Sequence, residues 1–311
     1  MLKEKDVGQI KEQGLTINQV IKQLEFFTIG IPPLHIVTSA TVGNGIKQLS
    51  LSEKEEYEQL YESLKDQREI VKFVPASGAA TRMFRFLYDF LDQYQPSEEH
   101  FRDFIKKHNN KQVEIFFNGM KDFAFVNQVR AKIRELYPEY KKSLKGERFY
   151  MFVKALLEEE GLNFGNLPKG LIPFHKYQKY STTAFEEQLY ESAFYAAVGD
   201  DVYLHFTFSE QHLKFFREEF ENIKNRVSRK TRKNFHISYS FQKKETNTIA
   251  VNNQNRPFRN EEDRLVFRPS GHGALLPNLN EVDADVVFIK NIDNVAAEEY
   301  VEEIAFYKKV L

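Results

Sequence analysis

The stretch I-V-K-F-V-P-A-S-G-A-A-T-R-M-F-R-F-L-Y, residues 70–88, decides the fold. Its first five residues, 70–74, form an apolar run whose β-branched and aromatic side chains predict a buried strand. Small or rigid residues follow at 75–80, and Thr81 is then placed to cap a helix with an apolar face. Strand, small-residue loop and helix is the order found in phosphate-binding turns, where backbone N–H groups and the helix N-terminus attract the anion.

The loop itself supplies the candidate ligands for such an anion. Small side chains at Ala76, Ser77, Gly78 and Ala79 let a phosphate approach the backbone, and Arg82 adds a guanidinium with a fixed fork of donors. A tight turn between a core strand and a helix also uses glycine and alanine, so a purely structural turn is the alternative. The loop is neither a Walker A motif nor a G-x-G-x-x-G motif. We predict that Ser77, Gly78, Thr81 and Arg82 line the deepest anion-binding pocket of the protein and that the first sheet strand leads directly into it.

Residues 74–83, V-P-A-S-G-A-A-T-R-M, resemble the signature loop of nucleotide-sugar pyrophosphorylases, a hydrophobic pair followed by A-G-G-x-G-T-R-L. Gly78, Thr81 and Arg82 match that loop, whereas a serine and an alanine replace two of its glycines. The resemblance implies that the loop holds the nucleotide phosphates. It also implies that Arg82 stabilises the departing pyrophosphate.

A second motif, L-P-K-G-L-I-P-F at residues 167–174, presents a lysine after a proline at the start of an apolar run. It is similar to the P-K-x-x-x-P-hydrophobic segment that follows the signature loop in the pyrophosphorylases. In that family the lysine contacts a phosphate of the sugar-1-phosphate or of the nucleotide. The resemblance therefore implies this role for Lys169.

A third motif, R-P-S-G-H-G at residues 268–273, follows a predicted strand at 265–267. Gly271 and Gly273 permit positive φ and let a ligand come close to the backbone, although a plain turn is an equally good interpretation. The segment resembles the G-H-G-D loop of UDP-glucose pyrophosphorylases, with Ala274 in place of the aspartate. The resemblance implies that Gly271, His272 and Gly273 contact the nucleotide.

The fourth motif, D-V-V-F-I-K-N-I-D-N-V at residues 285–295, is a predicted buried strand that ends in polar residues. A carboxylate at the carboxyl end of a parallel strand lies in the crevice where open α/β sheets bind ligands, and its oxygens suit Mg²⁺ shared with phosphates. The pyrophosphorylases have a similar strand followed by N-x-D-N-hydrophobic, which makes Asp293 the candidate metal ligand. The alternative is an Asp-Asn turn that caps the next helix.

Composition excludes several classes of protein. The chain of 311 residues has 44 basic and 45 acidic residues, a net charge of −1, so no overall charge attracts nucleic acid or an anionic membrane. It contains no cysteine, which excludes disulfides and thiolate chemistry. No apolar run approaches the ~20 residues of a membrane span, and the first residues lack the apolar core of a signal peptide. We expect a cytoplasmic protein whose anion site is local.

The order of the elements predicts an α/β fold. Strands alternate with helices, which favours a mainly parallel sheet with helices on both faces. Residues 1–65 form a predicted N-terminal helical segment packed on the core, and residues 66–311 form the α/β domain with a helical insertion at 96–164. Capping boxes are predicted at 52–55 and at 183–186.

The four motifs occur in the order found in the pyrophosphorylases, so the chain is similar to that nucleotidyltransferase superfamily, with its GT-A, Rossmann-like fold. The resemblance implies that a sugar-1-phosphate attacks the α-phosphorus of a nucleoside triphosphate, with Mg²⁺, to give a nucleotide-sugar and pyrophosphate. UTP is favoured because the third and fourth motifs look most like those of uridylyl enzymes.

The family has a second metal-binding aspartate well after the first, whereas this sequence ends eighteen residues past Asp293. Either the sequence is truncated or the site is incomplete. Two alternatives therefore stay open: a nucleotide- or nucleotide-sugar-binding protein without transfer activity, and a GT-A glycosyltransferase. The D-x-D formed by Asp283 and Asp285 precedes the strand instead of following it, which argues against the glycosyltransferase.

Overall fold

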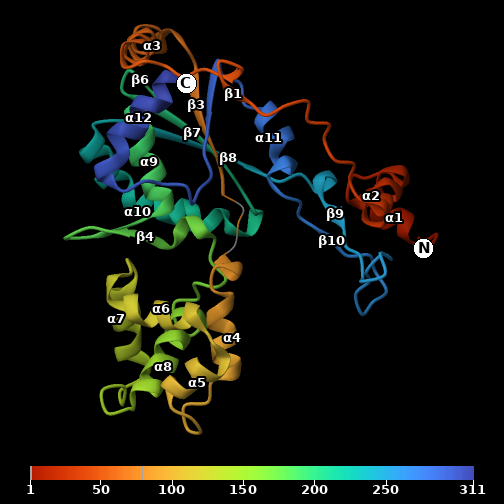
Figure 1. The fold of residues 1–311 in the computed structure, drawn as a ribbon, viewed down its shortest axis with the longest axis vertical. Coiled ribbons are helices and arrows are strands. Elements are labelled where there is room, and N and C mark those ends of the chain that lie inside the picture. Colours follow the sequence, from red (N-terminus) through yellow and green to blue (C-terminus); the bar gives the residue numbers. More distant parts are fainter. Residues whose placement is uncertain (1, 77, 79) are drawn as a thin grey trace.

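A parallel sheet forms the centre of the computed structural model, which describes residues 2–76, 78 and 80–311 (Figure 1). Its parallel strands lie in the order β11 (Val286–Ile289), β3 (Ile70–Pro75), β7 (Asp201–Phe208) and β8 (Asn234–Phe241). The short β6 (Ala197–Val198) pairs antiparallel with the start of β7. The apolar run at 70–74 is confirmed as a buried strand, and the protein is a mixed α/β protein.

Helices cover the two faces of this sheet unequally. α9 (Ala184–Tyr195) and α10 (Leu213–Thr231) pack on one face, where Leu204 and Phe206 of β7 are buried against Phe185 and Phe216. α12 (Val301–Val310) lies beside α9. Among the described helices, only the short α11 (Leu276–Asn280) covers the other face, and Tyr203 there is 43% exposed. The prediction of helices on both faces is therefore correct for one face and only partly correct for the other.

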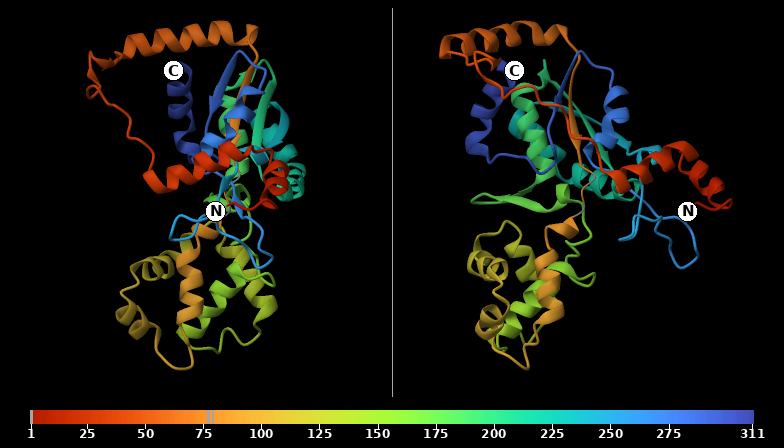
Figure 2. Two further views of the ribbon diagram at one scale, coloured as in Figure 1. Left: turned by 90° about the vertical axis from the view of Figure 1, so that its right-hand side faces the viewer. Right: turned by 45° about the vertical axis from the view of Figure 1, so that its right-hand side comes forward.

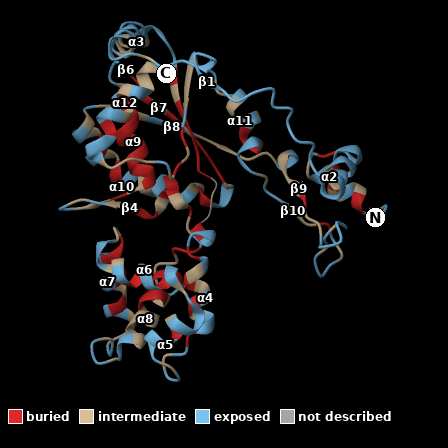
Figure 3. Ribbon diagram, in the orientation of Figure 1, coloured by how far each residue is buried: buried red, intermediate tan, exposed pale blue. Residues whose placement is uncertain are grey.

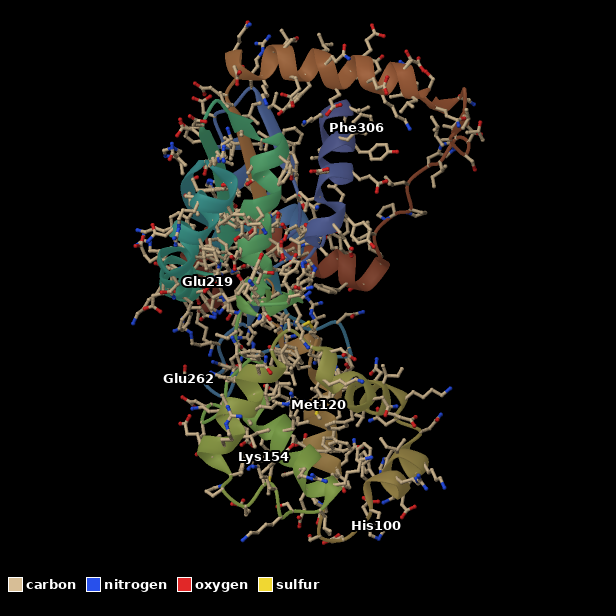
Figure 4. The ribbon with its side chains drawn as sticks, turned by 90° about the vertical axis from the view of Figure 1, so that its left-hand side faces the viewer. His100, Met120, Lys154, Glu219, Glu262 and Phe306 are labelled. Carbon is tan, nitrogen blue, oxygen red and sulfur yellow. The ribbon has the colours of Figure 1, made fainter. Side chains whose placement is uncertain are left out.

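A separate helical body lies beyond the carboxyl edge of the sheet. It consists of α4 (Arg85–Gln93), α5 (Phe101–His108), α6 (Lys111–Gly119), α7 (Val126–Leu136) and α8 (Lys145–Leu157). Figure 4 labels Met120 and Lys154 in this body and Glu219 on α10 in the α/β part. Its core is made of closely packed aromatic rings around Phe90. α4, the helix that follows the signature loop, packs here with the helices of residues 96–164 and not on the sheet.

The N-terminal helices contact two distant parts of the molecule. α1 (Asp6–Glu12) and α2 (Ile17–Ile29) pack on the antiparallel pair β9 (Thr248–Ile249) and β10 (Phe267–Arg268), forming an arm beside the sheet (Figure 2). α3 (Leu51–Leu64) instead packs on α12. Residues 30–50, with the two-residue strands β1 (Thr41–Val42) and β2 (Gly45–Ile46), connect these two parts and are largely exposed (Figure 3). The predicted strand at 265–267 overlaps β10 only at Phe267, while Leu265 forms an isolated bridge with Arg259, and β10 lies outside the central sheet.

Helix starts show which capping signals the chain uses. Ser50 and Glu53 form the capping box of α3, so the box predicted at 52–55 lies two residues too late. Both pairs, Ser50 with Glu53 and Ser52 with Glu55, fit the sequence pattern of a capping box, and the helix begins at the first of them. Thr183 caps α9 as predicted, because its Oγ1 accepts the Glu186 N–H at 3.1 Å. The Glu186 carboxylate, however, binds Arg226 and does not complete a box. No described helix is long and apolar enough to cross a bilayer.

Candidate functional site

A cleft of about 490 Å³ opens at the carboxyl ends of the parallel strands. It is lined by residues that follow β3, β7 and β8 and by residues near β10: Gly78, Thr81, Arg82, Ser209, Glu210, Gln242, Asn247, Pro269 and Ser270, with Phe208 and Phe241. Loops at this edge of a parallel sheet are where α/β proteins bind ligands. Within the described part of the chain, no carboxylate lies within ion-pair distance of Arg82, so its guanidinium is available to an anion.

Backbone contacts fix the described part of the signature loop. The Ala76 N–H donates to Thr207 O at 2.7 Å, which extends the pairing of β3 with β7 and uses the donor that we expected to face a phosphate. The Ala80 N–H donates to Leu167 O at 3.1 Å. Ser77 and Ala79, two further predicted phosphate-binding residues, lie outside the described residues.

Thr81 does not cap a helix, contrary to the prediction. A 3-10 turn at Ala80–Arg82 comes first, and α4 begins only at Arg85. The Thr81 hydroxyl instead donates to Gly165 O at 3.0 Å and joins the loop to the chain that leaves the helical body. The loop is therefore held between the sheet and the helical body, with Thr81 and Gly78 lining the cleft.

Three of the predicted motifs meet at Lys169. Its ammonium lies 2.7 Å from Oδ2 of Asp293, and its backbone N–H donates to Gly78 O at 3.1 Å. Gly170 makes this approach possible, because a Cβ there would lie 2.9 Å from Cγ1 of Ile292. Residues that are far apart in the sequence thus form one cluster beside the cleft.

The charge of Asp293 is held by its neighbours. Burial alone would raise the pKa of this carboxyl, but the hydrogen bond and charge of Lys169 lower the pKa on balance, and His272 adds to that effect. The carboxylate and the ammonium both keep about a third of their side-chain surface exposed, at 36% and 31%. The Asp293 carboxylate is therefore ionised at neutral pH, and both side chains are accessible from solvent.

The third motif takes a different conformation from the one predicted. Gly271 has a φ of −69°, and neither it nor Gly273 is among the described glycines with positive φ. Around both glycines, no described atom outside the neighbouring residues of the chain lies within 4 Å of the position that a Cβ would occupy. These glycines thus leave open space next to Pro269 and Ser270 on the cleft wall, and they are not needed for a positive φ.

A buried polar network holds the Asp293 loop from behind. The Gln188 side chain on α9 donates to the carbonyls of Asn291 at 2.8 Å and Ile292 at 3.3 Å. One turn further along the helix, Glu191 lies between Lys290 and Lys72, with Lys72 Nζ 3.2 Å from its carboxylate. Burial lowers the pKa of Lys72 to about 8, although the charge of Glu191 opposes this shift.

The sequence contains a signal for each of two site residues that were not predicted, Lys72 and Glu210. Lys72 interrupts the apolar run of β3, and a charge inside a buried strand requires a buried partner. Glu210 comes two residues after β7, so the argument applied to Asp293 after β11 also applies to it. A larger hollow, of about 740 Å³, lies in the arm and is lined by Phe27 and residues 248–254 among others.

The acids in the described residues do not form a metal cage, since no group of three or more His, Asp or Glu side chains is arranged to hold an ion. Asp293 nevertheless fits one kind of Mg²⁺ site. Mg²⁺ is commonly bound by one or two carboxylates while substrate phosphates and water complete its coordination. The partly exposed Asp293 carboxylate beside the cleft has the oxygen chemistry that such a site needs.

The fold and the site together define an α/β protein with a polar cleft, lined by Arg82 and Glu210 among others, at the carboxyl edge of the parallel strands. The chain belongs to the family described as "Domain of unknown function (DUF4301)", whose profile matches residues 3–311. No curated protein and no solved structure matches the chain.

Proposed function

We propose that this protein is a nucleotidyltransferase with a GT-A, Rossmann-like fold, which transfers a nucleotidyl group, with uridylyl favoured, to a sugar-1-phosphate. The observation that carries the proposal is the meeting of Lys169, Asp293 and Gly78 beside a cleft that also contains Arg82. One cluster offers cations for phosphates and a carboxylate for a metal. This is the set of groups that phosphoryl transfer requires.

In the proposed reaction, an oxygen of the sugar-1-phosphate attacks the α-phosphorus, and the bond from that phosphorus to the bridging oxygen breaks. Pyrophosphate leaves with the electron pair. Arg82 would stabilise its negative charge, and Lys169 would bind a phosphate oxygen and bring the two anions together. Mg²⁺, held by Asp293 and the triphosphate, would supply further charge stabilisation. The segment of Gly271, His272 and Gly273 would contact the nucleotide.

A specific observation also favours a rival function, which is nucleotide binding without transfer. Asp293 is ion-paired with Lys169, and the described residues supply no cluster of acids around it. A glycosyltransferase is less well supported, because Asp285 of the D-x-D accepts the Glu69 N–H at the amino end of β11. That end of the strand is the one opposite to the cleft.

The test measures pyrophosphate release by the full chain from UTP, ATP, GTP or CTP with Mg²⁺ and a panel of sugar-1-phosphates. We expect release that depends on both substrates and falls on the order of 10² to 10³-fold in Asp293→Asn, which removes one well-placed electrostatic group. The matched control is Asp283→Asn, an exposed acid before β11, which should retain wild-type turnover. Triphosphate binding without release would support the rival, and neither binding nor release would refute both.

A further inference from the structure

A second cavity, of about 310 Å³, lies away from the cleft and shares no lining residue with it. Side chains of α9, α10, the segment after β4 (Pro173–Lys176) and the start of α12 form its walls. The lining residues used below are Tyr177, Glu187, Tyr190, Ala193, Phe194, Lys230 and Glu298. Its volume is at the lower end of the range typical of small-molecule sites.

Glu187 is a buried carboxylate at this cavity, with only 3% of its side chain exposed. Its Oε1 lies 2.9 Å from Nδ1 of His175 and accepts hydrogen bonds from the hydroxyls of Tyr177, at 2.8 Å, and Thr182. Across the described residues, Oε2 has no hydrogen-bond partner, and no lysine or arginine reaches ion-pair distance of this carboxylate. One oxygen is therefore saturated, and the other is unused.

In the described part of the chain, no lysine or arginine offsets the charge of this carboxylate, and His175 can offset it only when its ring is protonated. Burial of a carboxylate is costly unless it is hydrogen-bonded and paired with an opposite charge. Tyr177 remains a donor to Glu187, because burial and then its hydrogen bond to Glu187 raise the pKa of its hydroxyl. Side-chain hydrogen bonds thus stabilise one oxygen of the buried carboxylate, and a bound cation would supply the opposite charge that it lacks.

The other walls show that the cavity already accommodates an ammonium group. Lys230 Nζ lies 2.7 Å from Glu298 and 4.6 Å from the centroid of the Tyr190 ring. Aromatic faces attract cations in this geometry. Because Lys230 neutralises Glu298, the charge that remains at the cavity is the one on Glu187. Ala193 and Phe194 add apolar surface next to it.

We propose that this cavity binds a small primary amine, whose ammonium group bonds to Glu187 and whose hydrocarbon part packs on Ala193 and Phe194. The site does not depend on the nucleotidyltransferase proposal, since it uses none of the cleft residues. An anionic ligand is disfavoured because it would meet the unpaired carboxylate. A neutral ligand would leave that carboxylate as it is.

The test is isothermal titration of the full chain with benzylamine, and with benzyl alcohol and benzoate as neutral and anionic probes of similar shape. We expect benzylamine to bind at least tenfold more tightly than either, and Glu187→Gln to weaken it on the order of tenfold to a hundredfold, as for loss of a charged hydrogen bond. The control Glu302→Gln, an exposed acid on α12, should bind like wild type.

A second variant guards against a loss of structure in Glu187→Gln. Ala193→Leu fills the cavity while the hydrogen bonds of Glu187 stay in place, so it should abolish benzylamine binding and leave the unfolding midpoint close to that of wild type. The proposal is overturned if wild type does not bind benzylamine at millimolar concentration, if the three probes bind equally, or if Ala193→Leu binds as wild type does.

Discussion

The helical body and the sheet region solve the problem of a buried core in different ways. In the helical body the core consists of apolar and aromatic side chains, with Phe90 surrounded by the rings of Tyr94, Phe104 and Phe117. The buried charged and polar side chains among the described residues all lie outside this body, and α9 carries five of them. The comparison shows that the core of the helical body is apolar, whereas the sheet region also buries charged and polar side chains, several of which contact the loop that contains Asp293.

α9 makes the point most clearly. Its residues Glu186, Glu187, Gln188 and Glu191 are all buried, although such a sequence is usual for an exposed helix. Glu186 pairs with an arginine, and Glu187 interacts with three side-chain groups. Gln188 donates to two loop carbonyls, and Glu191 lies between two lysines. Most buried polar groups in proteins have a hydrogen-bond partner, and here only Oε1 of Gln188 and Oε2 of Glu187 lack one among the described oxygens of these four side chains. The helix is therefore organised around the loop that contains Asp293 and around the second cavity.

The largest expected effect tests the packing side of the comparison. Phe90→Ala removes a fully buried ring from the helical body, which typically lowers the free energy of unfolding by about 4 kcal/mol. Urea unfolding followed by circular dichroism measures it. Ile115→Ala, at a position 70% exposed in the same body, is the control and should stay within about 0.5 kcal/mol. A small loss in Phe90→Ala would show that this core is loosely packed.

The next effect tests the charged side. Glu191→Gln leaves Lys72 and Lys290 buried without their counter-charge, and breaking a buried pair in this way lowers the free energy of unfolding by about 3 kcal/mol. Glu218→Gln breaks an exposed pair with Lys214, 3.8 Å apart, and should cost less than about 1 kcal/mol. If the two variants unfold alike, the buried network does not stabilise the sheet region.

The central strands could be predicted because their signal is local. Residues 70–74 and 286–289 are largely apolar runs bounded by polar or small residues, and the strand direction then places Asp293 at the carboxyl edge. The fourth motif predicts a buried strand, but β11 is only partly buried, with Ile289 50% exposed, because it is the edge strand of the sheet. The Lys169–Asp293 contact is not readable in this way, because it depends on how closely the chain at Gly170 packs on Ile292. The burial of the charged and polar side chains of α9 could not be predicted for a different reason, because their partners come from segments far away in the sequence.

The arm provides a third case, a buried carboxylate that is ion-paired with an arginine. Removing its charge is expected to change stability least of the three variants. Arg259 binds Asp6 with two nitrogens, at 2.9 and 2.7 Å, and Asp6 is only 2% exposed. The hydrogen bond from Arg259 lowers the pKa of Asp6 below its ordinary value of 3.8, against the opposing effect of burial. Unfolding releases Asp6 to its ordinary pKa, so the unfolded chain binds more protons at acid pH.

The sign of the pH dependence follows from that difference. The pair stabilises the arm fully above the unfolded pKa and loses this effect as the pH falls through the lower, folded pKa. Asp6→Asn should therefore be less stable than wild type by about 2 kcal/mol at pH 6, as for loss of a charged hydrogen bond, and the difference should shrink below pH 3.8. Urea unfolding at a series of pH values, followed by the NMR signals of arm amides, measures it. Glu12→Gln, whose exposed carboxylate lies 3.4 Å from Arg264, should give a difference near zero throughout. The difference in free energy of unfolding between wild type and Asp6→Asn could instead stay constant from pH 6 to pH 3. The carboxylate charge would then not hold the arm, and the apolar contacts around Ile10 and Val20 would hold it.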